Sequence, residues 1–184
     1  MKTKTLIPIL TATLTTLMAT SAQAITFNFE WLGDAGFSAS GSFSFDETTA
    51  PATFSESGLG PTNVLDSLTV SFFDPSNSLL ATFDNVVGGV STYEFLAFNF
   101  DTTTQELFGF LDIGEDTFTG TPGEFFLIGD VGISLDLVDA ALGPLDSNSG
   151  TITVSVASVP EPSSLIGLGL IGLGALAAKR KARS

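Results

Sequence analysis

The chain has 184 residues and a formal net charge of −14, with 20 acidic residues, six basic residues, no histidine and no cysteine. All the basic residues lie near the two ends, and no Lys, Arg, His or Cys occurs between Ile25 and Ala178. This inventory excludes Ser-His-Asp and Cys-His catalysis, His/Cys zinc sites, Schiff-base chemistry and P-loops from that stretch. It also argues against nucleic-acid binding, because a phosphate backbone would meet like charge.

The first 24 residues predict a secretory signal peptide. Lys2 and Lys4 form a short positive region, and a mostly apolar run follows from Leu6 to Met18. Ala22-Gln23-Ala24 then provides an A-x-A cleavage site, in which Ala22 and Ala24 are the small residues. An N-terminal membrane anchor is the alternative, but the apolar run is short for a membrane span. We therefore expect Ile25 to begin the mature chain.

Residues 25–158 are long enough for one domain with a hydrophobic core. Because an exported chain without cysteine forms no disulfide, burial of apolar side chains has to stabilise this domain. The sequence supplies 17 phenylalanines for that purpose, all between Phe27 and Phe126. The domain is also strongly acidic, since Glu161 is the one acidic residue that lies outside it.

Apolar and polar residues alternate with a period of two in several runs, which is typical of strands with one buried and one wet face. This alternation predicts strands at residues 25–31, 37–45, 67–72, 96–100 and 151–156. Clusters of Gly, Pro, Asn and Asp between the runs predict turns.

Three connecting segments complete this interpretation. Residues 101–105 predict a hairpin loop, residues 48–63 a long loop, and residues 133–142 either a strand or a short helix. Roughly eight or nine short strands at this spacing predict an all-β fold, an antiparallel β-sandwich that resembles a jelly roll. A closed barrel is the alternative.

The C-terminus, residues 159–184, joins three segments in order. Val159-Pro160-Glu161-Pro162 is a rigid polar segment, because each proline fixes φ. Residues 165–178 have no polar side chain and predict a single transmembrane helix, although about 21 Å of helix is short for a bilayer core of about 30 Å. The basic tail, residues 179–184, would set the topology by staying in the cytoplasm. Its basic residues are Lys179, Arg180, Lys181 and Arg183.

This tail closely resembles the PEP-CTERM sorting signal, also labelled an ice-binding protein C-terminal region, a label that implies no ice binding. The matching parts are Val159–Leu165, the Gly- and Leu-rich span of residues 166–176, and Lys179-Arg180-Lys181. The resemblance implies that an exosortase, a membrane-embedded cysteine transpeptidase-like enzyme, recognises Pro160, Glu161 and Pro162 and cuts nearby. It also implies an inner-membrane-anchored precursor, later delivered to the cell surface or extracellular matrix of an exopolysaccharide-making Gram-negative bacterium or cyanobacterium.

Calcium is one chemistry that remains open to the acidic domain, because hard cations take oxygen ligands. The densest acidic turn offers Asp112, Glu115 and Asp116 as candidate ligands. Weaker candidate pairs are Asp136 with Asp139 and Asp74 with Asn77. No D-x-[DN]-x-[DN]-G loop is present to support any of them.

Glycoside hydrolysis is the second open chemistry, because it needs only two carboxylates about 5–10 Å apart. Glu94 and Glu106 flank the predicted hairpin and form the candidate pair. Solvated carboxylates are the simpler interpretation of both residues.

We therefore expect a non-enzymatic exported protein with a structural or adhesive role, and no cofactor unless calcium binds. The expected partners are an exosortase, the membrane through residues 165–178 before processing, and exopolysaccharide, but no nucleic acid. A calcium-assisted carbohydrate-binding module is the alternative, and a carboxylate glycosidase is a third hypothesis.

Overall fold

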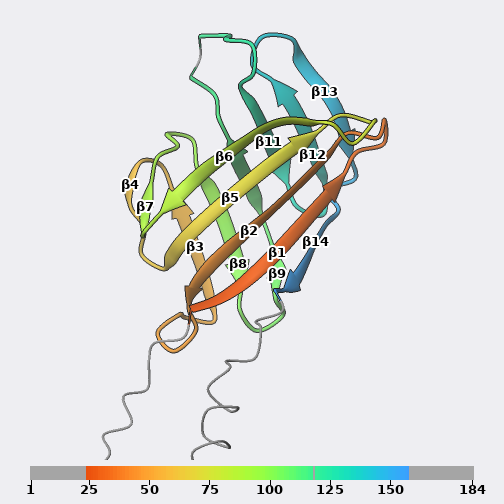
Figure 1. Cartoon of the computed structure of the whole chain (residues 1–184). Coiled ribbons are helices and arrows are strands. Elements are labelled where there is room, and N and C mark those ends of the chain that lie inside the picture. Colours follow the sequence, from red (N-terminus) through yellow and green to blue (C-terminus); the bar gives the residue numbers. More distant parts are fainter. Residues whose placement is uncertain (1–23, 118, 158–184) are drawn as a thin grey trace, which may run out of the picture.

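The computed structural model describes residues 24–117 and 119–157, which form 14 strands and no helix (Figure 1). Within these two ranges, no helix meets the length and hydropathy of a membrane span. The predicted signal peptide before Ala24, the Pro-Glu-Pro motif and the predicted transmembrane helix lie outside the described residues.

The strands form two antiparallel sheets. Sheet A has the order β14-β1-β2-β5-β6-β7-β4. Its strands are β1 (Ala24–Leu32), β2 (Ser38–Asp46), β4 (Gly60–Pro61), β5 (Leu65–Phe73), β6 (Leu79–Val87), β7 (Val90–Ser91) and β14 (Ile152–Val156). Sheet B has the order β13-β12-β11-β10-β8-β3, and β9 pairs with β8. Its strands are β3 (Thr53–Ser57), β8 (Ala97–Asp101), β9 (Glu106–Leu107), β10 (Phe110–Gly114), β11 (Phe125–Asp130), β12 (Ser134–Asp139) and β13 (Gly143–Asn148).

The prediction of a two-sheet antiparallel all-β fold is confirmed (Figure 1). Neighbours that follow one another in the chain form two longer runs, β10-β11-β12-β13 in sheet B and β5-β6-β7 in sheet A. The pairs β14–β1, β2–β5 and β8–β3 instead join strands that lie far apart in the chain. The sheets therefore combine meanders with long connections, and the finer resemblance to a jelly roll stays a prediction.

The long alternating runs form strands. Of the two loop predictions, one is confirmed and the other is wrong. The hairpin prediction is confirmed, because Phe100 pairs with Leu107 and Asp101 with Glu106. Residues 48–63 are not one long loop, since they contain β3 and β4. The ambiguous run at residues 133–142 holds strand β12.

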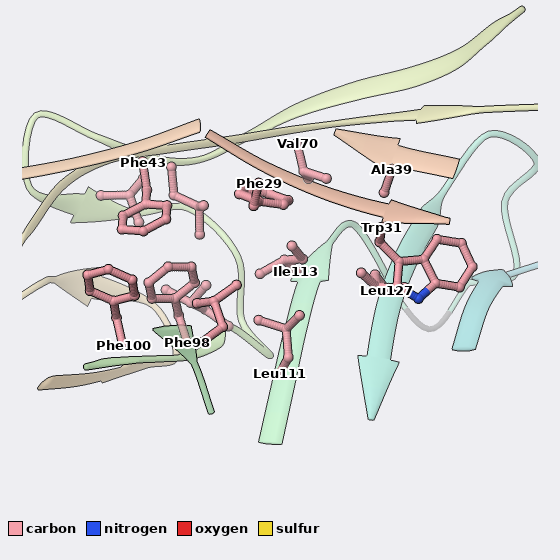
Figure 2. Close-up of a cluster of buried hydrophobic side chains, with 14 of the residues drawn as sticks. Phe29, Trp31, Ala39, Phe43, Val70, Phe98, Phe100, Leu111, Ile113 and Leu127 are labelled. Carbon is pink, nitrogen blue, oxygen red and sulfur yellow. The ribbon is translucent and has the colours of Figure 1, made fainter. Parts of the chain in front are cut away.

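Aromatic side chains from both sheets fill the space between them. Figure 2 shows Phe43 of sheet A facing Phe98 and Phe100 of sheet B, and both ring pairs have centroids 4.9 Å apart in edge-on geometry. Such contacts add to the stabilisation that burial itself provides. Phe29 and Trp31 extend the core toward β10 and β11 (Figure 2).

Side-chain hydrogen bonds join the sheets at their margins. The buried Asn85 amide on β6 donates to Gly114 O on β10 at 2.7 Å, and its Oδ1 accepts from Gly114 N at 2.9 Å. On β13 of sheet B, the Asp146 carboxylate accepts the N–H groups of Ala35 and Phe37, at 2.8 and 3.0 Å. The loop between β1 and β2 is thereby fixed to sheet B.

Candidate functional site

Both ends of the described chain lie at the same end of sheet A, which we call the tether end and define by Ala24 and Ala157. β14 is the antiparallel neighbour of β1, with Val156 opposite Phe27, and Ala157 N donates to Thr26 O at 2.8 Å. Figure 1 shows β1 beginning and β14 ending at the lower edge of the molecule. The two segments predicted to be processed therefore attach side by side.

The predicted signal-peptide cleavage coincides with the start of this sheet. Ala24 is exposed and is the first residue of β1, opposite Asp46 of β2. The buried side chains of β1 begin only at Phe27. Cleavage after Ala24 would therefore remove no core residue.

The predicted sorting and topology residues lie outside the described ranges, as does Ala22. These residues are Pro160, Glu161, Pro162, Lys179, Arg180, Lys181 and Arg183. Only Ser158 and Val159 separate Ala157 from Pro160. Three steps along a chain reach at most about 11 Å, so any enzyme that reads Pro160 works beside the tether end.

The three calcium candidates do not form one ligand cluster. In the described part of the chain, no three acidic side chains are placed to hold a metal ion. Leu111 and Ile113 occupy the core, so Asp112 between them points to the other face of sheet B. There its Oδ1 accepts the Tyr93 hydroxyl at 2.8 Å. Glu115 is exposed to solvent.

Burial changes the acidity of the Tyr93–Asp112 pair. Desolvation raises the pKa of Asp112 to about 6; the Tyr93 hydrogen bond opposes this effect, and the negative charge of Asp116 adds to it. Desolvation, followed by the charge of Asp112, also raises the pKa of Tyr93 far above its usual value. Because burial outweighs the hydrogen bond, the folded state is more stable when Asp112 is protonated, although the Tyr93 hydroxyl itself favours the carboxylate.

The weaker calcium candidates serve as turn caps. Asp139 is buried and accepts the N–H groups of Ala141 and Leu142, at 2.8 and 3.0 Å. Asp74 accepts the N–H groups of Ser76 and Ser78, at 2.9 and 2.8 Å. The hydrogen bond from the Ser76 hydroxyl has the largest effect on the pKa of Asp74. Together with the two backbone bonds, it holds that pKa below its usual value.

The candidate glycosidase pair is separated by the length of a strand. Glu106 lies opposite Asp101, the last residue of β8, whereas Glu94 lies in the turn before Ala97, the first residue. Four strand steps span about 13 Å, and Glu94 lies three residues further back. The hairpin therefore places the two carboxylates at opposite ends of β8 and does not bring them together.

A groove that the sequence did not reveal lies on the outer face of sheet A, at the end opposite the tether end. Its volume is about 670 Å³. Its lining includes Glu30, Leu32, Ser38, Ser40, Phe73 and Thr153. The Ser and Thr residues belong to the polar half of the alternating runs, a pattern that indicated a wet face without marking any part of it.

Comparison with known proteins assigns the tail of the chain. Residues 158–183 match the PEP-CTERM protein-sorting motif, which confirms the resemblance noted in the sequence. The match lies wholly outside the β-sandwich and begins directly after Ala157. No curated protein and no solved structure matches the chain.

Proposed function

We propose that this chain, which carries a PEP-CTERM sorting motif, is a non-enzymatic exported protein with a structural or adhesive role. An exosortase processes its tail, and the β-sandwich is then delivered to the cell surface or the exopolysaccharide matrix. The motif at residues 158–183 is the observation that carries the proposal, because it supports export, a membrane-anchored precursor and exosortase sorting.

The position of the tail on the fold is consistent with this role. Ala157 lies at the tether end, so a precursor anchored through residues 165–178 would hold that end toward the membrane. The opposite end, with the groove, would then face outward. Trimming near Pro160 would release the sandwich without removing a strand, because β14 ends at Val156.

The absence of an enzymatic role is part of the same proposal. Glu94 and Glu106, the carboxylate pair suggested by the sequence, lie at opposite ends of β8. The buried carboxylates of Glu56 and Asp139 accept hydrogen bonds from backbone N–H groups. These bonds favour a structural role for both residues. No resident cofactor is proposed.

Substitution of Glu161 tests the sorting step. In a host that has an exosortase, Glu161→Ala should accumulate as an untrimmed, membrane-associated precursor, detected by fractionation and immunoblotting. Glu106→Ala is the matched control, because Glu106 is an exposed glutamate on β9. If Glu161→Ala is trimmed and delivered like the control, the tail acts only as an anchor and the proposal fails.

A further inference from the structure

We infer that the groove on the outer face of sheet A binds a neutral polysaccharide chain. This inference names a ligand class for the surface protein proposed above and rests on that proposal for its biological setting. The groove combines a row of side chains that includes Leu32 and Phe73 with a polar row that includes the unpaired carboxylate of Glu30.

The strand register builds the two rows. Leu32 of β1 lies opposite Ser38 of β2, which lies opposite Phe73 of β5. One row closer to the tether end, Glu30 lies between Thr153 of β14 and Ser40 of β2. Apolar side chains thus lie beside hydroxyl and carboxylate groups across neighbouring strands, which are about 4.8 Å apart.

The row that contains Leu32 and Phe73 has exposed apolar side chains. Leu32, which lines the groove, is 65% exposed, and Leu79, which lies beside the groove and opposite Phe73 on β6, is 60% exposed. Apolar groups gathered on one face with polar residues around them mark a contact site more often than isolated ones do. A pyranose ring presents a face of C–H groups that fits such a row.

Two polar side chains of the groove, Glu30 and Ser40, differ from other polar side chains of the same face, whereas the Thr153 hydroxyl donates to Glu30 O at 3.3 Å. Further along the sheet, the hydroxyls of Ser44 and Ser67 bond one another at 2.6 Å, and the Thr69 hydroxyl donates to Asp84 at 2.8 Å. In contrast, the Glu30 carboxylate and the Ser40 hydroxyl make no hydrogen bond to any residue in the described ranges. They are free to bond the hydroxyl rim of a sugar.

Charge selects among the saccharides. Glu30 is an acceptor for sugar hydroxyls, and no Lys or Arg occurs between Ile25 and Ala178 to pair with a uronate or sulfate. An anionic chain would meet like charge in the groove and around it. A neutral chain is therefore the ligand that both the lining and the charge favour.

The groove is held in shape by hydrogen bonds beneath its rim. The Asn148 amide donates to Leu32 O at 2.9 Å and to Thr151 O at 2.8 Å, which fixes β1 relative to the start of β14. Asp146 holds the adjoining loop through Ala35 and Phe37. A preformed site loses less conformational entropy when its ligand binds.

Calorimetric titration of the full chain, purified from its expressing host, tests the inference. The probes are cellohexaose and laminarihexaose, with hexagalacturonate as the anionic comparison, in buffer that contains a chelator. We expect saturable binding of at least one neutral hexasaccharide. Glu30→Gln and Leu32→Ser should each weaken it about tenfold, because each removes one contact to the bound chain.

Matched controls separate the groove from the rest of the surface. Leu59→Ser removes a leucine that is 63% exposed and lies outside the groove, and Glu106→Gln neutralises an exposed glutamate on sheet B. Both controls should bind like the wild type, and unchanged thermal melting of all four variants shows that they are folded.

Several results overturn the inference. Among them are the absence of saturable binding by both neutral probes, equal binding of hexagalacturonate, and equal losses in the groove and control variants. A dimer that Leu32→Ser dissociates in sedimentation experiments would assign the groove to a second copy of the chain. Because the titration uses purified protein, its outcome is independent of whether Glu161 directs sorting.

Discussion

Glu56 illustrates how single residues stabilise a fold that contains no basic partner. Its carboxylate is 4% exposed and accepts backbone N–H groups of Asn63 and Val64 at 3.0 and 2.7 Å, with a longer bond from Leu65 at 3.4 Å. Charge-assisted hydrogen bonds of this kind replace the salt bridge that the sequence cannot supply. Glu56 thereby fixes the segment that leads into β5.

Glu56→Gln should lower the free energy of unfolding by about 1–3 kcal/mol. The amide nitrogen of glutamine would face backbone donors, so at least one buried N–H loses its acceptor. Urea denaturation at neutral pH measures the change, and Glu106→Gln on the exposed strand β9 is the control. Equal stability of the two variants would contradict the structural role of Glu56.

Asp112 predicts a pH dependence with a definite sign. Its pKa is raised to about 6 in the folded state, from an ordinary value of 3.8, chiefly by burial. A raised pKa means that the folded state holds the proton more tightly, so the contribution to stability is full below about pH 4 and is lost as the pH rises through about 6.

Asp112→Asn removes this loss, because the neutral amide can still accept the Tyr93 hydroxyl. Relative to the wild type, the variant should gain about 1–2 kcal/mol of unfolding free energy between pH 4.5 and pH 7.5, after solvent screening. Urea melts at both pH values measure it, and the exposed Asp130→Asn is the control. A gain that is the same at both pH values would disprove the assignment.

At the scale of elements, the packing of β2 against β1 requires a glycine, Gly41, at one position of β2. A Cβ atom at Gly41 would collide with the Phe29 ring and with the backbone oxygen of Thr69. Phe29 lies opposite Gly41 in the register of β1 and β2, and its ring occupies the space that the glycine leaves. Gly41 thus makes room for the Phe29 ring of the neighbouring strand β1 in the core.

Gly41→Ala should therefore destabilise the protein by about 1–3 kcal/mol through overpacking. Phe29→Leu should relieve part of this loss, so the double variant should be more stable than the sum of the two single effects. Ser42→Ala, on the wet face of β2, is the control in urea denaturation. Strict additivity of Gly41→Ala and Phe29→Leu would mean that the two sites do not compete for space.

The elements also show what the sequence could predict. The long alternating runs became β1, β2, β5, β8 and β14, because apolar residues at every second position, which include pairs of phenylalanines in β1, β2 and β8, leave a clear period of two. β3 was missed because its inward residues are Phe54 and Glu56, and a buried carboxylate disguises the alternation. β4, β7 and β9 have two residues each, too few for any periodicity.

The sequence could predict one of the candidate sites but not the others. The sorting tail could be read directly, because its motif is contiguous in the chain. The calcium candidates were chosen by proximity in sequence, and the pleat places Asp112 beneath Tyr93 and leaves Glu115 in solvent. The groove could not be predicted, since it depends on which strands lie beside β1 and on which hydroxyls bond one another.

At the scale of the whole molecule, charge is the dominant feature of the mature protein. Processing at both predicted sites would remove all six basic residues and leave the carboxylates of the β-sandwich without a cationic partner. Self-repulsion of this kind destabilises a compact state and is screened by salt, with a Debye length of about 10 Å at 0.1 M.

The melting temperature of the processed protein should therefore rise by several degrees between low salt and 0.3 M NaCl. Because no three acidic side chains in the described ranges are placed to hold a metal ion, CaCl₂ at the same ionic strength should give a similar rise. Differential scanning calorimetry with a chelator control measures both effects. A saturable, calcium-specific rise would restore Asp112, Glu115 and Asp116 as a binding site.

The most direct test is the intact mass of the protein from the cell surface and from the membrane fraction of a host with an exosortase. We expect a surface form that begins at Ile25, ends near Pro160 and lacks the apolar and basic segments of the tail, together with a longer precursor in the membrane fraction. Recovery of the intact 184-residue chain from the cytosol, with neither end removed, would contradict export and sorting together.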